Sequence, residues 1–159
     1  MSANQREAAP IVTAASIAAC GGVSRDTRRK WTQRMPPLVR PGPQFTTHDA
    51  IETAIVAALA NVNHKRGPDA WLAVRNDVRQ YVLSGVDELW IVMSAQGNFA
   101  RVACVTSEAT HFASTASCPV YVVALGAVIS AARERFDQEI ARLASKSHAK
   151  SAQVKSIQA

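Results

Sequence analysis

The sequence predicts an α+β fold: a small helical head, then a small antiparallel β-sheet with a long C-terminal helix. Three observations support this prediction. Residues 13–34 hold two short helical segments separated by a pair of glycines, and residues 88–124 hold three apolar segments rich in β-branched side chains. Residues 125–144 repeat apolar side chains at steps of three and four, which is helical spacing.

Composition limits the class of protein. Of the 159 residues, 48% are hydrophobic, which suffices for a buried core and excludes a fully disordered chain. The 18 Lys and Arg outnumber the 12 Asp and Glu, giving a formal net charge of +6. This excess favours a polyanionic partner, either nucleic acid or an anionic membrane surface.

The chain carries no targeting signal that we recognise. No stretch reaches the roughly 18 consecutive apolar residues of a transmembrane helix, so we expect no membrane partner. Residues 1–10 are polar, lack the apolar core of a secretory signal, and are expected to form a disordered tail. Three cysteines, an odd and sparse set, are typical of reduced thiols, so we expect a cytoplasmic protein associated with the nucleoid.

Two helices are predicted at the start of the head. The first begins after Thr13, whose hydroxyl suits an N-cap, and ends at the glycine pair 21–22, where a positive φ is permitted. Ser24 is the next cap, and the second helix is expected over residues 25–34.

Basic side chains crowd into this second helix and the segment after it. From position 25 to 40, six Lys and Arg face one acid, so this stretch carries +5 of the net charge of +6. A solvated helix face is the ordinary explanation, but the place directly after a helix–glycine–helix turn favours contact with DNA. The predicted DNA-binding residues are Ser24, Arg25, Thr27, Arg28, Arg29, Lys30, Arg34 and Arg40.

Within this set, the chemistry of each side chain predicts its target. We assign base edges to Arg25 and Arg28, because arginine forms bidentate bonds to guanine. Arg29 and Lys30 are assigned to phosphates. Ser24 and Thr27 are also candidates for phosphate contact, with helix capping the favoured role of Ser24.

A proline-rich connector, residues 35–45, follows the basic helix. Its four prolines cannot continue a helix or fill a central strand, so we expect a constrained loop or short ribbon. Arg40 near its tip is expected to reach a phosphate or the minor groove. A third helix then follows a threonine cap, so residues 11–64 are predicted to form a winged helix-turn-helix DNA-binding domain.

The head contains the motif Ala18-x-x-x-Gly22-Val23-Ser24-x-x-Thr27-x-Arg29-x-Trp31. This motif resembles the head of the mercury-resistance (MerR) regulators. Asp49, four residues after Phe45, is similar to that family's entry into the helix after the wing. The resemblance covers residues 12 to about 62 and implies a winged helix-turn-helix on DNA. Promoter untwisting and metal sensing are not carried over, because no long dimer helix or cysteine loop is evident.

The remainder of the chain is expected to pair and regulate the head. Residues 65–86 are predicted to form a linking helix, and residues 87–145 an α+β dimerisation domain. The Ser- and Thr-rich segment 107–117 is expected to be a loop; one alternative makes it the pocket of a small-molecule effector. The strands are expected at 88–93, 99–106 and 120–124.

Apolar residues of the C-terminal helix form a coiled-coil-like seam. Pairing with a second copy is favoured over packing on the chain's own sheet, because three strands and one helix make a small core. The expected dimerisation residues are Ile129, Ala132, Phe136, Ile140 and Leu143. Residues 146–159 have little apolar content and are expected to be a flexible basic tail.

No catalytic or metal-binding constellation is predicted. Cys104, His111 and Cys118 are separated by six residues on each side, whereas structural zinc sites usually have four ligands and tight Cys-x-x-Cys pairs. No Ser-His-Asp or paired-carboxylate arrangement is evident, so we expect neither an enzyme nor a cofactor.

The sequence thus predicts a sequence-specific protein that binds double-stranded DNA and acts as a homodimeric transcriptional regulator. Two alternatives stay open. One is an architectural DNA-binding protein, similar to an excisionase or a segregation protein. The other is a ligand-controlled switch that acts through the C-terminal domain.

Overall fold

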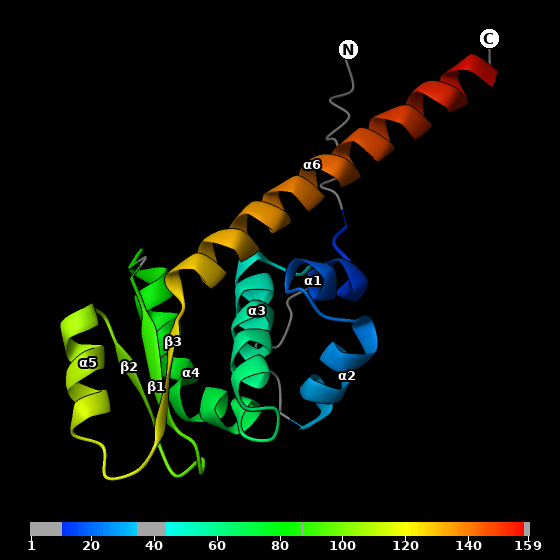
Figure 1. The fold of residues 1–159 in the computed structure, drawn as a ribbon. Coiled ribbons are helices and arrows are strands. Elements are labelled where there is room, and N and C mark those ends of the chain that lie inside the picture. The colour runs from blue at the N-terminus through cyan, green and yellow to red at the C-terminus, as the bar shows by residue number, and fades with distance from the viewer. Residues whose placement is uncertain (1–10, 35–43, 87, 158–159) are drawn as a thin grey trace.

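The computed structural model describes residues 11–34, 44–86 and 88–157. The predicted α+β class is confirmed: helices surround a small antiparallel sheet, and a long helix ends the chain (Figure 1). The elements are α1 (Ala14–Cys20), α2 (Arg25–Arg34), α3 (Thr47–Val62), α4 (Gly67–Leu83), β1 (Trp90–Ser94), β2 (Ala100–Ala103), α5 (Thr106–Ser114), β3 (Val120–Ala124) and α6 (Gly126–Ile157). The predicted tail, residues 1–10, lies outside the described residues.

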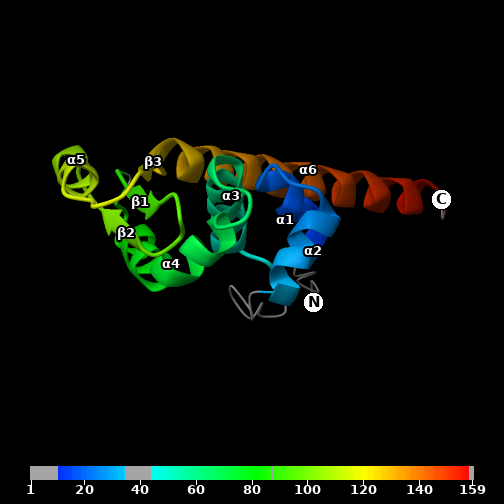
Figure 2. The same cartoon turned by 60° about the horizontal axis from the view of Figure 1, so that its bottom comes forward.

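The sheet has β1 in its centre, in the order β2-β1-β3, and both pairings are antiparallel. Successive side chains of a strand point to opposite faces. Ile91 and Met93 of β1 are therefore buried in the main core with residues of α4, whereas Val92 is buried with Ala109 of α5. Figures 1 and 2 show α5 on one side of the strands and α4 on the other.

The main core crosses the boundary that the sequence predicts between the head and the second half. One buried cluster joins Leu59 of α3, Trp71 of α4, Ile91 of β1 and Ile129 of α6. Helix α4 forms as predicted, but it is part of this core and does not link two separate bodies. Its buried side chains recur at steps of three and four, which places them on one face between α3 and the sheet.

Helix α6 packs on its own chain, which corrects the expected dimer seam. Ile129 and Ala132 belong to the main core, and Phe136 is buried in a second cluster with Ile17 and Cys20 of α1. The prediction underestimated the core, because the head folds back on α6 and buries the apolar face that was assigned to a partner. Ile140 and Leu143, the remaining two residues of that seam, pack against the second cluster and are half-buried.

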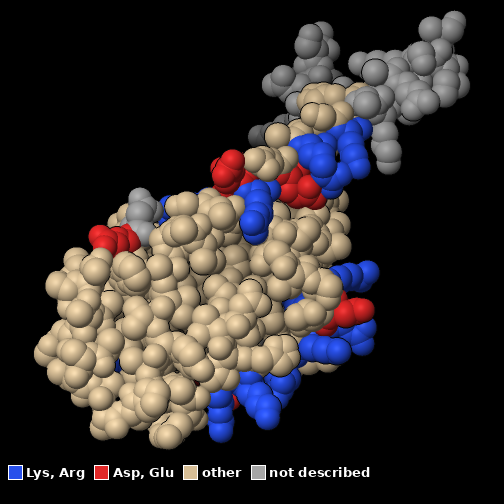
Figure 3. Space-filling model, in the orientation of Figure 1, with Lys and Arg blue, Asp and Glu red and all other residues tan. Residues whose placement is uncertain are grey.

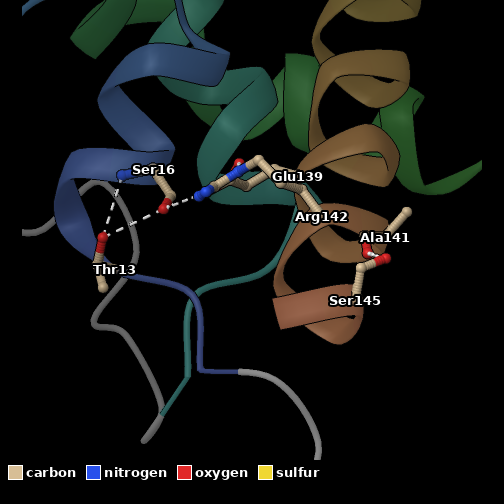
Figure 4. A network of polar contacts seen from close by, with 6 residues as sticks. All are labelled: Thr13, Ser16, Glu139, Ala141, Arg142 and Ser145. Atoms are coloured by element: carbon tan, nitrogen blue, oxygen red, sulfur yellow. Dashed lines mark hydrogen bonds and ion pairs between the residues drawn. The ribbon is translucent and has the colours of Figure 1, made fainter. Parts of the chain in front are cut away.

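A polar network joins α1 to α6 beside the second cluster (Figure 4). Ser16 Oγ donates a hydrogen bond of 2.7 Å to Glu139 Oε1, and Arg142 donates bonds of 2.6 Å to both carboxylate oxygens of Glu139. The hydrogen bonds from Arg142 are the main cause that lowers the pKa of Glu139 to about 2. Thr13 caps α1 as predicted, accepting from the Ser16 N–H at 3.2 Å.

Two predictions of irregular structure are wrong. Segment 107–117 is largely helix α5, because Ala109 is buried against the sheet and Glu108 accepts the Cys104 N–H at 3.0 Å. This packing offsets the low helix propensity of Ser and Thr. The expected flexible tail, 146–159, continues α6 as far as Ile157, since its Ala, Lys and Gln favour helix and no Gly or Pro interrupts it.

Candidate nucleic-acid interface

The turn between α1 and α2 has the geometry that its glycine pair predicts. Gly22 has a φ of +74°, the left-handed conformation that favours glycine. The N–H groups of Gly22 and Val23 donate to the carbonyls of Ala19 and Ala18 at 3.0 and 2.9 Å. These two bonds form a Schellman motif, which ends α1 and sends the chain directly into α2.

The other glycine of the pair sets how closely this turn approaches α3. A Cβ atom added at Gly21 would lie 2.4 Å from Thr53 Cγ2 and 3.2 Å from the backbone nitrogen of Ala54. The turn therefore rests on the backbone of α3, and only a residue without a side chain fits there. This contact positions the start of α2 against the core.

Ser24 and Thr27 have structural partners in the first turn of α2. Ser24 Oγ accepts the Thr27 N–H at 3.1 Å, as an N-cap does, and the two hydroxyl oxygens are 2.9 Å apart. Capping, the role that the sequence favoured for Ser24, is thus present in the structure. Ser24 is also exposed, so its remaining hydrogen-bonding capacity faces solvent.

Arg28 does not lie on the exposed side of α2. Its Nε donates to Thr53 Oγ1 at 3.2 Å, and its guanidinium carbon lies 5.1 Å from the centre of the Phe45 ring. Burial lowers the pKa of Arg28, while the nearby carboxylates of Asp49 and Glu52 act in the opposite direction. We therefore correct the assignment of Arg28 to a base edge: its side chain fastens α2 to α3.

A sequence signal for this inward position exists, and the prediction missed it. Residues three apart lie on one side of a helix. Trp31 follows Arg28 by three and packs against the main core, so both side chains point toward α3. Thr53 and Phe45 hold the guanidinium. No motif marks Thr53, and Phe45 entered the resemblance only through its spacing from Asp49, because both roles depend on the packing of α3 under α2.

The remaining cations of α2 are exposed. At about 100° per residue they fan out over the half of the helix opposite Arg28 and Trp31. Figure 3 shows basic side chains gathered over and below α2. Within the described residues, none of these cations takes part in an ion pair. The exposed cations are Arg25, Arg29, Lys30 and Arg34.

Two acids beneath α2 are occupied inside the protein and do not neutralise that surface. Asp49 accepts the N–H and the hydroxyl of Thr46 at 2.7 and 2.9 Å, and thus caps α3. Glu52 is buried and pairs with Arg79 of α4. Burial raises the pKa of Glu52 despite this pairing. Asp26, the one acid on α2, is exposed on the same half as the four cations, so the outward half of α2 keeps a net positive charge.

The predicted wing cannot be placed on this surface. Its residues 35–43, including Arg40, lie outside the described residues. Arg40 as a phosphate contact and the winged form of the domain stay predictions.

A hollow of about 240 Å³ opens beside the end of α5, close to the segment that the sequence proposed as an effector pocket. The guanidinium of Arg101 lies 5.4 Å from the ring centre of Phe112 at this hollow. An effector stays a prediction, since no ligand chemistry is specified by these contacts. The lining residues are Phe99, Arg101, Phe112, Thr115, Ala116 and Ser117.

Among the residues that the structure describes, no group of three or more His, Cys, Asp or Glu side chains is arranged to hold a metal ion. In the same part of the chain, no helix is both long and apolar enough to cross a membrane. Comparison of the chain with protein-family models, with curated proteins and with solved structures found no match.

Proposed function

We propose that the chain binds double-stranded DNA through the outward half of α2 and acts as a sequence-specific transcriptional regulator, with two copies on one site. The single observation that carries this proposal is the exposed set of cations on α2. The helix follows directly after a Schellman turn, and its exposed cations form no ion pairs within the described residues. The role in transcription rests on the resemblance of residues 12–62 to MerR heads.

The geometry of α2 suits a duplex for two reasons. A helix presented by a tight helix–turn–helix can enter the major groove, which is about 12 Å wide. Cations without internal partners can neutralise phosphates and release counterions, which makes binding depend on salt. Arg25 and Arg29, one turn apart on the outward half, are the residues that we assign to the DNA surface first.

The test is a titration of labelled duplex DNA, followed by fluorescence anisotropy. A selection from random duplexes with the purified protein supplies the target, and a scrambled duplex supplies the nonspecific reference. We expect Arg25→Ala to weaken specific binding by roughly tenfold, since a base contact contributes about 1–3 kcal/mol. Arg29→Ala, which removes a phosphate contact, should weaken binding to the selected and the scrambled duplex alike. Arg101→Ala removes an exposed arginine from β2 and is the matched control.

Unchanged DNA binding by an α2 variant would contradict the proposal. If the double variant Arg25→Ala, Arg29→Ala keeps the wild-type affinity and the wild-type salt dependence, α2 is not the DNA surface. If selection yields no preferred duplex but binding remains salt-dependent, the architectural alternative replaces the regulator. Footprinting separates the same two cases, because a coating protein protects a long region and a regulator protects a short one.

A further inference from the structure

The two edges of the sheet are built differently. Natural proteins protect an open edge with short strands, charged side chains, proline or bulges, because unpaired backbone groups there invite another strand. The β2 edge is only four residues long and carries the exposed Arg101. The β3 edge is five residues long and contains no charge and no proline within the strand.

The hydrogen bonds at the two ends of β3 show which backbone groups face the open edge. Ala95 N–H donates to Pro119 O at 2.9 Å, and Leu125 N–H donates to Leu89 O at 2.7 Å. In an antiparallel ladder, the residues that bond across to the neighbour alternate along the strand. Positions 119, 121, 123 and 125 therefore face β1, and the N–H and C=O groups of Val120, Val122 and Ala124 face outward.

The side chains at this edge are apolar and accessible. Tyr121 is 38% exposed and Val122 is 44% exposed. The sequence contains no Asp, Glu, Lys or Arg between Glu108 and Arg133, a stretch that covers β3 and the start of α6. Figure 3 shows the corresponding face, over β3, α3 and the first turns of α6, as almost bare of charge.

We propose that β3 pairs with β3 of a second copy, antiparallel and around a two-fold axis at Val122, to give a continuous six-stranded sheet. In this register Val122 faces Val122 of the second copy, and Val120 faces its Ala124. Each of these pairs exchanges two backbone hydrogen bonds, because all three residues present outward groups.

A second copy fits this edge better than an unrelated strand for reasons of symmetry and charge. Antiparallel self-pairing satisfies the outward groups of both strands with the same set of residues, which is the property of an isologous interface. No like charges oppose each other, since β3 carries none. A groove of about 350 Å³ between α3 and α6 carries one charged side chain, Arg135, and alanines make up half of its lining, so small side chains leave room for close approach.

This dimer does not depend on the DNA proposal, because β3 and α2 share no residue and the pairing needs no ligand. It also replaces the seam on α6 that the sequence predicted, whose side chains are used inside the chain. The two proposals therefore fail separately: one concerns the mass of the free protein, the other its affinity for a duplex.

The experiment measures the mass of the purified full chain by sedimentation equilibrium over a range of concentrations. We expect wild-type protein to approach twice 17.0 kDa. Val122→Lys should weaken the dimer at least tenfold, because two like charges would face each other across the axis. Leu83→Lys, which places the same charge at an apolar position that is 70% exposed, should leave the mass unchanged.

Mixing two variants of opposite charge tests whether the two-fold axis of the dimer lies at Val122. Val122→Lys and Val122→Glu chains should each be monomeric, and their equimolar mixture should recover the dimer, because opposite charges then face each other. Both variants should fold, as the Val122 side chain is partly exposed and its N–H does not bond to β1. Circular dichroism and thermal melting check this folding.

Cross-linking gives a second measurement that introduces no charge. Residues that face each other in a hydrogen-bonded antiparallel pair have Cα atoms about 5.5 Å apart, within the range of a disulfide. Mild oxidation of Val122→Cys should therefore yield a covalent dimer, and Leu83→Cys should not. Wild-type protein measures the background from Cys20, Cys104 and Cys118.

Two results overturn the proposal. One is wild-type protein that stays at the monomer mass up to about 100 µM, where even weak pairing would be populated. The other is a wild-type dimer that Val122→Lys leaves intact and that Val122→Cys does not cross-link, which would place the contact elsewhere.

Discussion

The outward half of α2 and the open edge of β3 are opposite kinds of surface in one small protein. The α2 surface presents four exposed cations and one exposed acid, Asp26, and within the described residues none of these cations forms an ion pair. The β3 edge presents unpaired backbone groups beside Tyr121 and Val122, and no charged side chain. A chain with a formal net charge of +6 has thus kept its charge away from one face and concentrated it on another.

The difference has a physical consequence. Attraction between exposed charges is screened by salt, whereas backbone pairing and apolar burial are not. A polyanion would therefore bind the first surface in a salt-dependent manner, and an uncharged strand would bind the second at any ionic strength. The same chain can use both surfaces at once, because α2 and β3 belong to different parts of the fold (Figures 1 and 2).

The largest expected effect is the response of the two surfaces to salt, which should be strong for DNA binding at α2 and weak for pairing at β3. Raising salt from about 50 to 200 mM should weaken DNA binding by roughly a hundredfold for each bound copy if all four of its α2 cations meet phosphates. The same change should alter the dimer dissociation constant by less than about twofold. Anisotropy titration measures the first quantity and sedimentation equilibrium the second. Equal salt dependence of both would contradict the division of roles.

The next effect tests whether the α2 surface is held rigidly by the core. Gly21→Ala should lower the free energy of unfolding by about 2–3 kcal/mol, because the new methyl group overlaps Thr53 and approaches the α3 backbone. Gly85→Ala is the control: its φ is +75° but no atom lies within 4 Å, so about 1 kcal/mol is expected. Urea denaturation measures both, and equal losses would show that the contact with α3 does not position the turn.

A smaller effect distinguishes the buried Arg28 of α2 from the exposed Arg29 next to it. Arg28→Ala should destabilise the fold by about 1–2 kcal/mol, since it removes the bond to Thr53 and the contact with Phe45. Arg29→Ala should leave the unfolding midpoint unchanged and weaken DNA binding instead. Thermal melting and duplex titration on the two variants separate a structural arginine from a binding one. If both variants lose only affinity, the corrected position of Arg28 is wrong.

The smallest expected effect is on stability and concerns the hydrogen bonds of Glu139 between α1 and α6. Glu139→Gln should cost about 1 kcal/mol at neutral pH, because the ionised carboxylate accepts bonds from Ser16 and Arg142. Its folded pKa of about 2 lies below the ordinary value of 4.5, so the ionised form is the stabilising one. The contribution is fully present above about pH 4.5 and is lost as the pH falls toward 2. Urea denaturation of the wild type and of Glu139→Gln at pH 7 and pH 2 measures this contribution. A difference in midpoint that is the same at both pH values would contradict the assigned role of the carboxylate.

Local signals predicted most of the helices and strands well. Thr13, the glycine pair 21–22 and Ser24 correctly mark where α1 begins and ends and where α2 begins, because caps and turns depend on neighbours in the chain. The three strands were placed to within a few residues, since β-branched runs between turn residues are also local. The predictions failed where a distant surface decided the outcome, as at α5, which the sheet stabilises.

The candidate site was also predicted only where local signals suffice. The sequence identified the basic helix, but periodicity alone could not tell which side of it faces the core. Arg28 was assigned to a base edge because arginine forms bidentate bonds to guanine, whereas Trp31 one turn later marks the buried side. Whether Arg25, Arg29, Lys30 and Arg34 meet DNA stays a prediction, and so does Arg40.

The sequence by itself determined the α+β class, the turn that presents α2 and the concentration of positive charge on that helix, because each depends on residues within a few positions of one another. Only the tertiary structure decided which arginine is buried, what covers the apolar face of α6 and which sheet edge stays open. Those outcomes depend on the packing of segments that are distant in the chain, from 25 residues for Arg28 against Thr53 to 123 for Ser16 against Glu139, and local patterns carry no record of such contacts.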